Sequence, residues 1–148
     1  MAQPLNYTFA MKKIDLACII DDDPVYVYGA KRLMEIVDFC ENLLVFHNGE
    51  DAIKYLKPVV EQGERAPEII LLDINMPIMD GWQFLDEFAK IQPHCRRKIA
   101  IYMVSSSIDP ADFNKAKSYS EVSDYIIKPI EEDDLRSLSV FRKEFYES

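Results

Sequence analysis

The sequence predicts an α/β fold in which a parallel sheet carries helices on both faces. Short runs of apolar residues alternate with stretches whose apolar residues recur at helical spacing, and this alternation occurs five times along the chain. Such alternation is typical of sheets built from right-handed strand–helix–strand crossovers. The runs at residues 16–20 and 69–72 are apolar at consecutive positions, which is the pattern of a strand covered on both faces, although periodicity alone leaves a buried helical segment open. The composition does not fix the order of the strands.

The size and charge of the chain limit the classes of protein to which it can belong. Its 148 residues suit one domain, which at this size buries about two-thirds of its unfolded surface. The net charge of -9, from 26 acidic and 17 basic residues, argues against nucleic-acid binding, which requires a basic face. The three cysteines are isolated and indicate neither a disulfide framework nor a thiolate metal site: Cys18, Cys40 and Cys95. With no signal-peptide pattern and no apolar run near the ~20 residues of a membrane span, we expect a cytoplasmic protein without a membrane partner.

The first elements set the domain boundary. Residues 1–13 have no clear period and are expected to form a loosely ordered extension, and residues 14–148 to form the domain. The apolar run at residues 16–20 predicts a strand that ends in three consecutive acids. Asp23 suits the N-cap of a helix whose first turn begins with Pro24.

Four more strands and four more helices follow in alternation. The strands are expected at residues 42–46, 69–72, 98–104 and 122–127. The helices are expected at residues 52–60, 84–91 and 110–117, and from residue 131. The acidic start of the last helix complements its helix dipole.

Polar residues follow four of the predicted strands. Three acids come after the first strand, and single polar residues follow three later ones: Asp73, Ser105 and Lys128. Because ligands of open α/β sheets bind outside the carboxyl ends of the strands, we expect these side chains to share one site. Clustered carboxylates raise their pKa values or recruit a cation, and Mg²⁺ favours carboxylates together with water and phosphate oxygens. The sequence therefore predicts a site for Mg²⁺ and a phosphoryl group.

Each of these residues also has an ordinary structural interpretation. Asp73 can cap a turn, Ser105 can cap a strand end, and Lys128 can be a solvated lysine. As members of one site, Asp73 would be the nucleophile, Lys128 a positive charge for the phosphoryl oxygens and Ser105 a hydrogen-bond donor. The agreement of four strand ends favours the site.

From about residue 16 onward, the sequence resembles the receiver domain of bacterial response regulators, the phosphoryl acceptors of two-component signalling. The matching segments, in chain order, are residues 19–24, 72–81, 104–106 and 125–129. The resemblance implies a flavodoxin-like doubly wound sheet of five parallel strands in the order 2-1-3-4-5, with helices on both faces.

The resemblance also implies a metal site. By position, Asp73 is similar to the phospho-acceptor, Asp22 to the direct Mg²⁺ ligand and Asp21 to a ligand acting through water. Asn75 is similar to the residue that lends its backbone carbonyl to the metal. The three consecutive acids leave the alignment of Asp22 and Asp23 open by one position.

Three further positions match the switch of this family. Ser105 resembles the switch hydroxyl, Tyr125 the switch aromatic and Lys128 the lysine that contacts the phosphoryl group. The bond between Lys128 and Pro129 resembles the family's cis peptide. The chain departs from the family pattern at residues 119–122, where a Gly-Ala pair is common, and in having Ser where Thr is usual at the switch hydroxyl.

We therefore expect a single-domain response regulator that is not an enzyme. It would take a phosphoryl group onto Asp73 from a sensor histidine kinase or phosphotransfer protein, with Mg²⁺ as cofactor. Ser105 would then move toward the phosphoryl group and Tyr125 would turn inward, changing a surface that contacts an unidentified protein target. Because only 18 residues follow Ile130, we expect no separate DNA-binding module.

Two other functions remain as alternatives. One is a Mg²⁺-dependent phosphohydrolase with an aspartyl nucleophile, but Asn75 stands where such enzymes have a second aspartate as general acid. The other is an inert scaffold whose carboxylates bind only a metal ion. Multiple-turnover phosphatase activity would favour the first, and partner binding that ignores phosphodonor would favour the second.

Overall fold

The structure is a computed structural model, and it describes residues 13–138. The predicted extension, apart from Lys13, and the last ten residues of the predicted domain lie outside the described residues.

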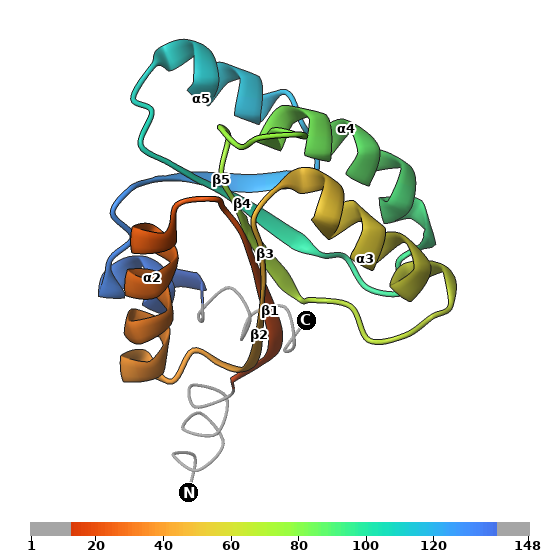
Figure 1. The fold of residues 1–148 in the computed structure, drawn as a ribbon, viewed down its shortest axis with the longest axis horizontal. Coiled ribbons are helices and arrows are strands. Elements are labelled where there is room, and N and C mark those ends of the chain that lie inside the picture. The colour runs from red at the N-terminus through yellow and green to blue at the C-terminus, as the bar shows by residue number, and fades with distance from the viewer. Residues whose placement is uncertain (1–12, 139–148) are drawn as a thin grey trace, which may run out of the picture.

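One sheet of five parallel strands runs through the centre of the molecule (Figure 1). Its order is β2-β1-β3-β4-β5, which confirms the order implied by the resemblance. The strands are β1 (Ile14–Ile20), β2 (Cys40–Phe46), β3 (Ile69–Leu72), β4 (Ala100–Ser105) and β5 (Val122–Ile127). The chain order reverses between β1 and β3, and this switch point is where open α/β sheets bind their ligands.

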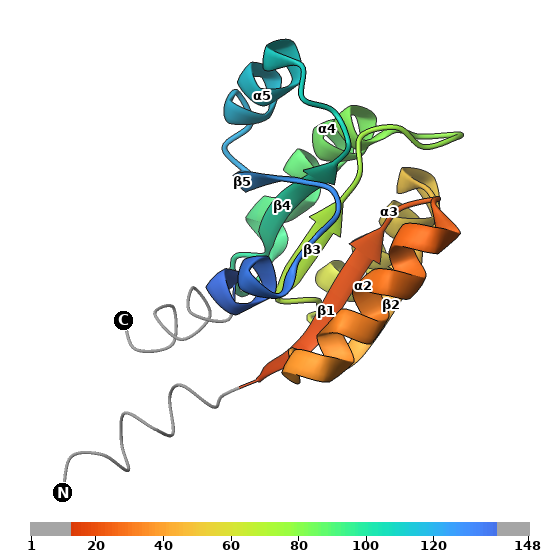
Figure 2. The same ribbon diagram turned by 90° about the vertical axis from the view of Figure 1, so that its left-hand side faces the viewer.

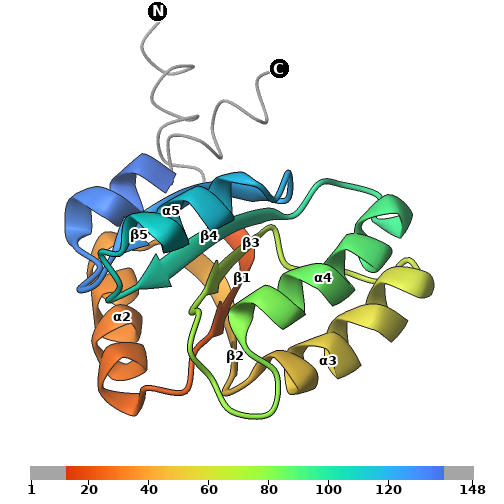
Figure 3. The same ribbon diagram turned by 90° about the horizontal axis from the view of Figure 1, so that it is seen from above.

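Helices cover both faces of the sheet, as the alternating pattern predicts (Figures 2 and 3). They are α2 (Pro24–Val37), α3 (Gly49–Glu61), α4 (Gly81–Ile91), a 3-10 turn η1 (Gln92–His94), α5 (Pro110–Lys117) and a helix at residues 132–138. On one face, α2 and the helix at 132–138 bury Val27, Met34 and Leu135 against β1 and β4. On the other, α3 and α4 bury Leu56 and Phe88 against the same strands.

The N-terminal end of α2 forms as predicted. The side chain of Asp23 accepts hydrogen bonds from the backbone N–H groups of Val25 (3.0 Å) and Tyr26 (3.3 Å). Pro24 occupies the first helical position, where its missing N–H costs no hydrogen bond. The first strand therefore passes into α2 through a short, rigid turn.

Several strand bounds differ from those predicted, because the ladder of hydrogen bonds decides them and apolarity does not. The β1 strand begins at Ile14, whose N–H donates to Phe39 O, and β2 begins two residues earlier than predicted. The β4 strand starts later, at Ala100, whose N–H donates to Glu68 O, and it includes Ser105. Ser105 thus occupies the last ladder position instead of following the strand.

Helices in the described range are all too short or too polar to cross a membrane.

Candidate functional site

The strand register brings Asp21 and Asp73 together. Ile20 pairs with Leu72 across β1 and β3, so the residues that follow leave the sheet side by side. The N–H of Asp73 donates to Ile20 O at 3.0 Å, which continues the ladder by one residue. Both carboxylates are buried, with 1% of Asp21 and 7% of Asp73 exposed.

A third carboxylate completes the cluster. Asp21, Asp22 and Asp73 each offer an oxygen, and these oxygens all lie within 4.8 Å of one another. Asp22 is exposed, so the cluster opens to solvent on its side. Asp23 points its carboxylate at the first turn of α2 instead. Of the two acids that the sequence left open, Asp22 is the one that joins the cluster.

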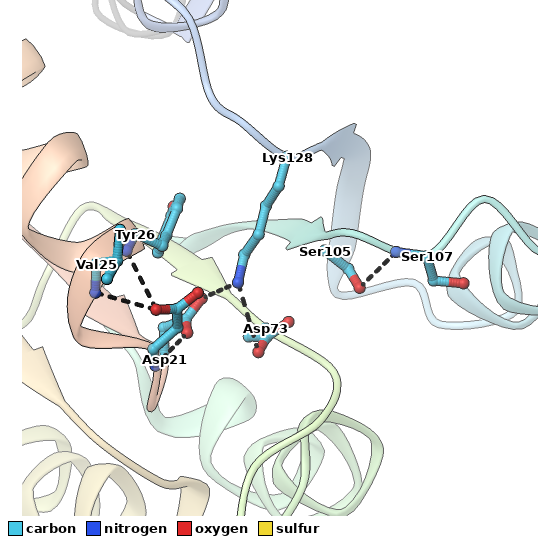
Figure 4. A network of polar contacts seen from close by, with 8 residues as sticks. Asp21, Val25, Tyr26, Asp73, Ser105, Ser107 and Lys128 are labelled. Carbon is cyan, nitrogen blue, oxygen red and sulfur yellow. Dashed lines mark hydrogen bonds and ion pairs between the residues drawn. The ribbon is translucent and has the colours of Figure 1, made fainter.

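Lys128 extends from the end of β5 into this cluster (Figure 4). Its Nζ lies 2.9 Å from Oδ2 of Asp21 and 3.7 Å from Oδ2 of Asp73. The same ammonium lies 4.4 Å from the centre of the Tyr26 ring. The peptide bond between Lys128 and Pro129 is cis, which confirms that prediction.

Burial and mutual repulsion raise the pKa values of the two buried carboxyls. Burial is the main cause for Asp73, and the neighbouring charge of Asp21 adds to it; the Lys128 ammonium acts in the opposite direction, and the resulting pKa is about 6. Burial also raises the pKa of Asp21, and its ion pair with Lys128 and the N–H of Asp23 oppose that rise. One ammonium therefore leaves three carboxylates incompletely neutralised.

The cluster fits a hard divalent cation. The buried Oδ2 of Asp21 already has the Lys128 ammonium at 2.9 Å, and Asp73 shares that same ammonium. The three carboxylates are together short of positive charge, and Mg²⁺ binds through one or two carboxylates with the rest of its shell from water and phosphate. Asp21, Asp22 and Asp73 would hold the ion.

Ser105 and Tyr125 are connected through the backbone of Ser107. The buried hydroxyl of Ser105 accepts a hydrogen bond from the N–H of Ser107 at 3.2 Å. The Tyr125 hydroxyl donates to the carbonyl oxygen of Ser107 at 3.0 Å, and its ring packs edge-on against Phe113. The two predicted switch residues thus contact the same residue of the loop that follows β4.

The loop that follows β3 turns back closely on Asp73. Gly81 N donates to Ile74 O at 2.7 Å, and a Cβ at Gly81 would lie 2.3 Å from the carbonyl oxygen of Asp73. Asn75 is exposed in this loop, and its proposed carbonyl contact with a metal stays a prediction. Asp80 and Gln83 form a capping box at the start of α4.

Sequence reasoning missed the parts played by Gly81 and Tyr26. Gly81 appeared only within a matching segment, although an Asp-Gly pair before a helix is a signal for a tight turn. Tyr26 is one of several apolar residues that recur at helical spacing along α2. Its position beneath an ammonium has no signal in the sequence, since Lys128 lies 102 positions further along the chain.

Comparison with known families identifies the domain. The model of the response regulator receiver domain matches residues 17–139. The chain belongs to this family. Receiver domains are signalling modules that take part in two-component systems, and Mg²⁺ binding and phosphorylation are general among them.

Individual relatives agree with this assignment. A two-component response regulator from Cytophaga hutchinsonii has a crystal structure that superimposes with a TM-score of 0.80 at 31% identity, over 90% of this chain and 99% of that one. The probable methanogenesis regulatory protein FilR2 of Methanothrix harundinacea is 25% identical over 86% of this chain and 81% of its own length. The transcriptional regulatory protein HptR of Staphylococcus aureus is 26% identical over 76% of this chain. The match spans only 40% of HptR, so the receiver domain is the part in common.

A separate cavity of about 470 Å³ lies at the opposite, amino-terminal edge of the sheet. Its walls include Val60, Ile69 and Ile99, and Arg65 and Arg96 also line it. The carboxylate cluster is not part of it.

Proposed function

We propose that this receiver domain accepts a phosphoryl group on Asp73 from a sensor histidine kinase or a phosphotransfer protein. The observation that carries the proposal is the meeting of Asp73 with two further carboxylates and the Lys128 ammonium at the switch point of the sheet. Asp21, Asp22, Asp73 and the backbone carbonyl of Asn75 would bind Mg²⁺. The ion, when bound, would neutralise charge on the phosphoryl oxygens.

The residues of the chain have separate tasks in this reaction. A carboxylate oxygen of Asp73 attacks phosphorus, and the bond from phosphorus to the donor's imidazole nitrogen breaks, leaving an aspartyl phosphate. Lys128 places its positive charge beside the three oxygens of the transferred group. Nucleophilic attack requires the deprotonated carboxylate, and at neutral pH a pKa of about 6 leaves Asp73 mostly ionised.

Signal output would follow from movement at Ser105 and Tyr125. A phosphoryl oxygen on Asp73 would accept a hydrogen bond from the Ser105 hydroxyl. This would shift the backbone of Ser107, to which Ser105 and Tyr125 are both hydrogen-bonded. The surface formed by β4, α5 and β5 would change shape with it. We propose a protein target for this surface, because a chain with a net charge of -9 is poorly suited to binding nucleic acid. A cytoplasmic location is part of the proposal.

The phosphohydrolase alternative has less support. Asn75 cannot act as a general acid, and the family has signalling as its general role.

Labelling by a small phosphodonor tests the proposal. Incubation of the protein with acetyl phosphate and Mg²⁺ should add one phosphoryl group, measured by intact mass spectrometry. Asp73→Ala should remove the labelling, because it removes the proposed acceptor oxygen. Asp15→Ala, at an exposed aspartate on β1 far from the cluster, is the matched control and should label normally. Labelling that persists in Asp73→Ala would show that Asp73 is not the acceptor, and steady release of phosphate over many turnovers would favour the hydrolase.

A further inference from the structure

Tyr26 contacts the ammonium of Lys128 through its ring. Nζ of Lys128 lies 4.4 Å from the ring centre, well inside the range of a cation–π interaction (Figure 4). The Tyr26 backbone is fixed by the N-cap bond to Asp23, in the first turn of α2. The aromatic ring is therefore held on a rigid element beside the cluster.

The phenol oxygen does not explain why a tyrosine is present. It is buried and has no hydrogen-bond partner among residues 13–138. Among the described residues, Tyr26 therefore interacts with Lys128 through its ring and not through its hydroxyl. Burial of the phenol raises its pKa, and the neighbouring carboxylates of Asp21 and Asp73 raise it further, so the ring carries no charge of its own.

Lys128 and a bound cation would compete for the same carboxylate. The nearest anion to the ammonium is Oδ2 of Asp21, at 2.9 Å, whereas Asp73 is 3.7 Å away. A divalent cation bound to Asp21 would weaken that ion pair and repel the ammonium as a like charge. The contact with Tyr26 involves no carboxylate, so a cation bound to Asp21 does not compete for it.

We propose that Tyr26 is a positioning residue whose ring keeps the Lys128 ammonium beside Asp73 once a cation occupies Asp21. The ammonium then faces the phosphoryl group instead of turning out to solvent. This inference rests on the proposed function for its role in phosphorylation, while the contact itself stands on geometry alone.

Proton NMR of the metal-free protein tests the contact directly. Methylene protons next to the Lys128 ammonium should be shifted upfield by the ring current of Tyr26. Tyr26→Phe should keep this shift, and Tyr26→Leu and Tyr26→Met should lose it. Tyr28→Leu, at a residue of the same helix that is 68% exposed, is the matched control and should leave it unchanged. A wild-type shift equal to that of a solvated lysine would overturn the proposal without any variant.

Phosphorylation kinetics test the role. With acetyl phosphate and saturating Mg²⁺, Tyr26→Leu should be phosphorylated about 2- to 30-fold more slowly than wild type, the range expected from losing one cation–π contact. Tyr26→Phe should stay within about twofold of wild type. Mg²⁺ affinity, titrated without donor, should not weaken in either variant. A general disturbance at the start of α2 would weaken it, since Asp21 and Asp22 directly precede that helix.

The outcomes separate the two proposals. Wild-type protein that takes no label at Asp73 contradicts the proposed function, and the NMR shift still decides the contact. Normal labelling of wild type together with equal rates for Tyr26→Leu and Tyr26→Phe contradicts only the role of Tyr26. A weaker Mg²⁺ affinity in Tyr26→Leu, with no rescue by Tyr26→Phe, also contradicts it. If Tyr26→Leu does not fold, Tyr26→Met takes its place.

Discussion

Asp73 occupies a position where burial and charge act against its ionised form. Only 7% of the residue is exposed, and Asp21 adds a second negative charge nearby. The Lys128 ammonium lies 3.7 Å from Asp73 but closer to Asp21, so it compensates Asp73 only in part. In the absence of a cation, ionised Asp73 therefore destabilises the fold that positions it.

This repulsion predicts a pH dependence of stability. The pKa of Asp73 is raised from 3.8 to about 6, so between these values the folded chain binds the proton more tightly than the unfolded chain does. The contribution of Asp73 to the free energy of unfolding then falls as pH rises through this window and stays low above it. In Asp73→Asn this decrease in the free energy of unfolding should be absent. The variant should be more stable than wild type at pH 7.5 by about 1–3 kcal/mol.

Urea unfolding at a series of pH values, in the presence of a chelator, measures the difference in the free energy of unfolding between wild type and Asp73→Asn. Saturating Mg²⁺ is the control, because a bound cation offsets the repulsion and should narrow the gap between the two proteins at pH 7.5. Parallel pH profiles for wild type and Asp73→Asn would contradict the expectation.

At the scale of elements, the start of α4 determines the path of the loop that carries Asp73 and Asn75. Gly81 packs its backbone directly against the carbonyl of Asp73, with no room for a side chain. The capping box of Asp80 and Gln83 fixes the helix end at the same place. The start of α4 and the proposed phosphorylation site are therefore held together as one structural unit.

Gly81→Ala should displace this unit. Its Cβ would lie 2.3 Å from Asp73 O and 3.0 Å from Cα of Ile74, and both are backbone atoms that cannot move alone. We expect a loss of about 1–3 kcal/mol in the free energy of unfolding and slower labelling of Asp73. Gly29→Ala is the matched control: it lies in α2 with no atom within 4 Å of an added Cβ, and should gain up to about 1 kcal/mol. Chemical denaturation measures the free energy of unfolding of both variants. Equal effects of the two substitutions would be evidence against the steric argument.

At the scale of the whole molecule, much of the fold followed from the sequence because strands covered on both faces are recognisable locally. The strand order did not follow from composition, since order depends on contacts between distant segments; it came from the resemblance. The strand bounds were displaced by one or two residues where backbone hydrogen bonds, as at Ile14 and Ala100, extend or shorten the ladder.

The site was predictable to the extent that it lies at strand ends. Asp21, Asp73 and Lys128 meet because parallel strands bring their carboxyl ends to one edge. Tyr26 lies on a helix, and only the three-dimensional fold brings its ring to the ammonium of Lys128, which follows β5. Such a residue acts through contact with a site residue and not from a strand end. It can therefore be identified only from the structure.

Cation binding should be visible in the stability of the whole domain. A cation that occupies the folded cluster would find no such cluster in the unfolded chain, so Mg²⁺ should raise the free energy of unfolding by about 2.7 kcal/mol at 100 times its dissociation constant. Thermal unfolding across a Mg²⁺ series measures this, and addition of chelator should reverse it. Asp22→Ala, which removes an exposed carboxylate of the cluster, should reduce the gain. A gain unaffected by that substitution would place the ion elsewhere.

The bond from Tyr125 to Ser107 O has a consequence for how strongly the domain can respond. This hydrogen bond joins the ring to the loop after β4 through protein atoms alone, so it does not require a phosphoryl group on Asp73. If a fraction f of the unstimulated molecules already has the output conformation, no input can raise that fraction by more than 1/f-fold. We therefore expect a measurable background of target binding before stimulation and a limited dynamic range above it. The strength of this single hydrogen bond would then determine how much target binding can increase on phosphorylation, independently of how fast Asp73 is phosphorylated.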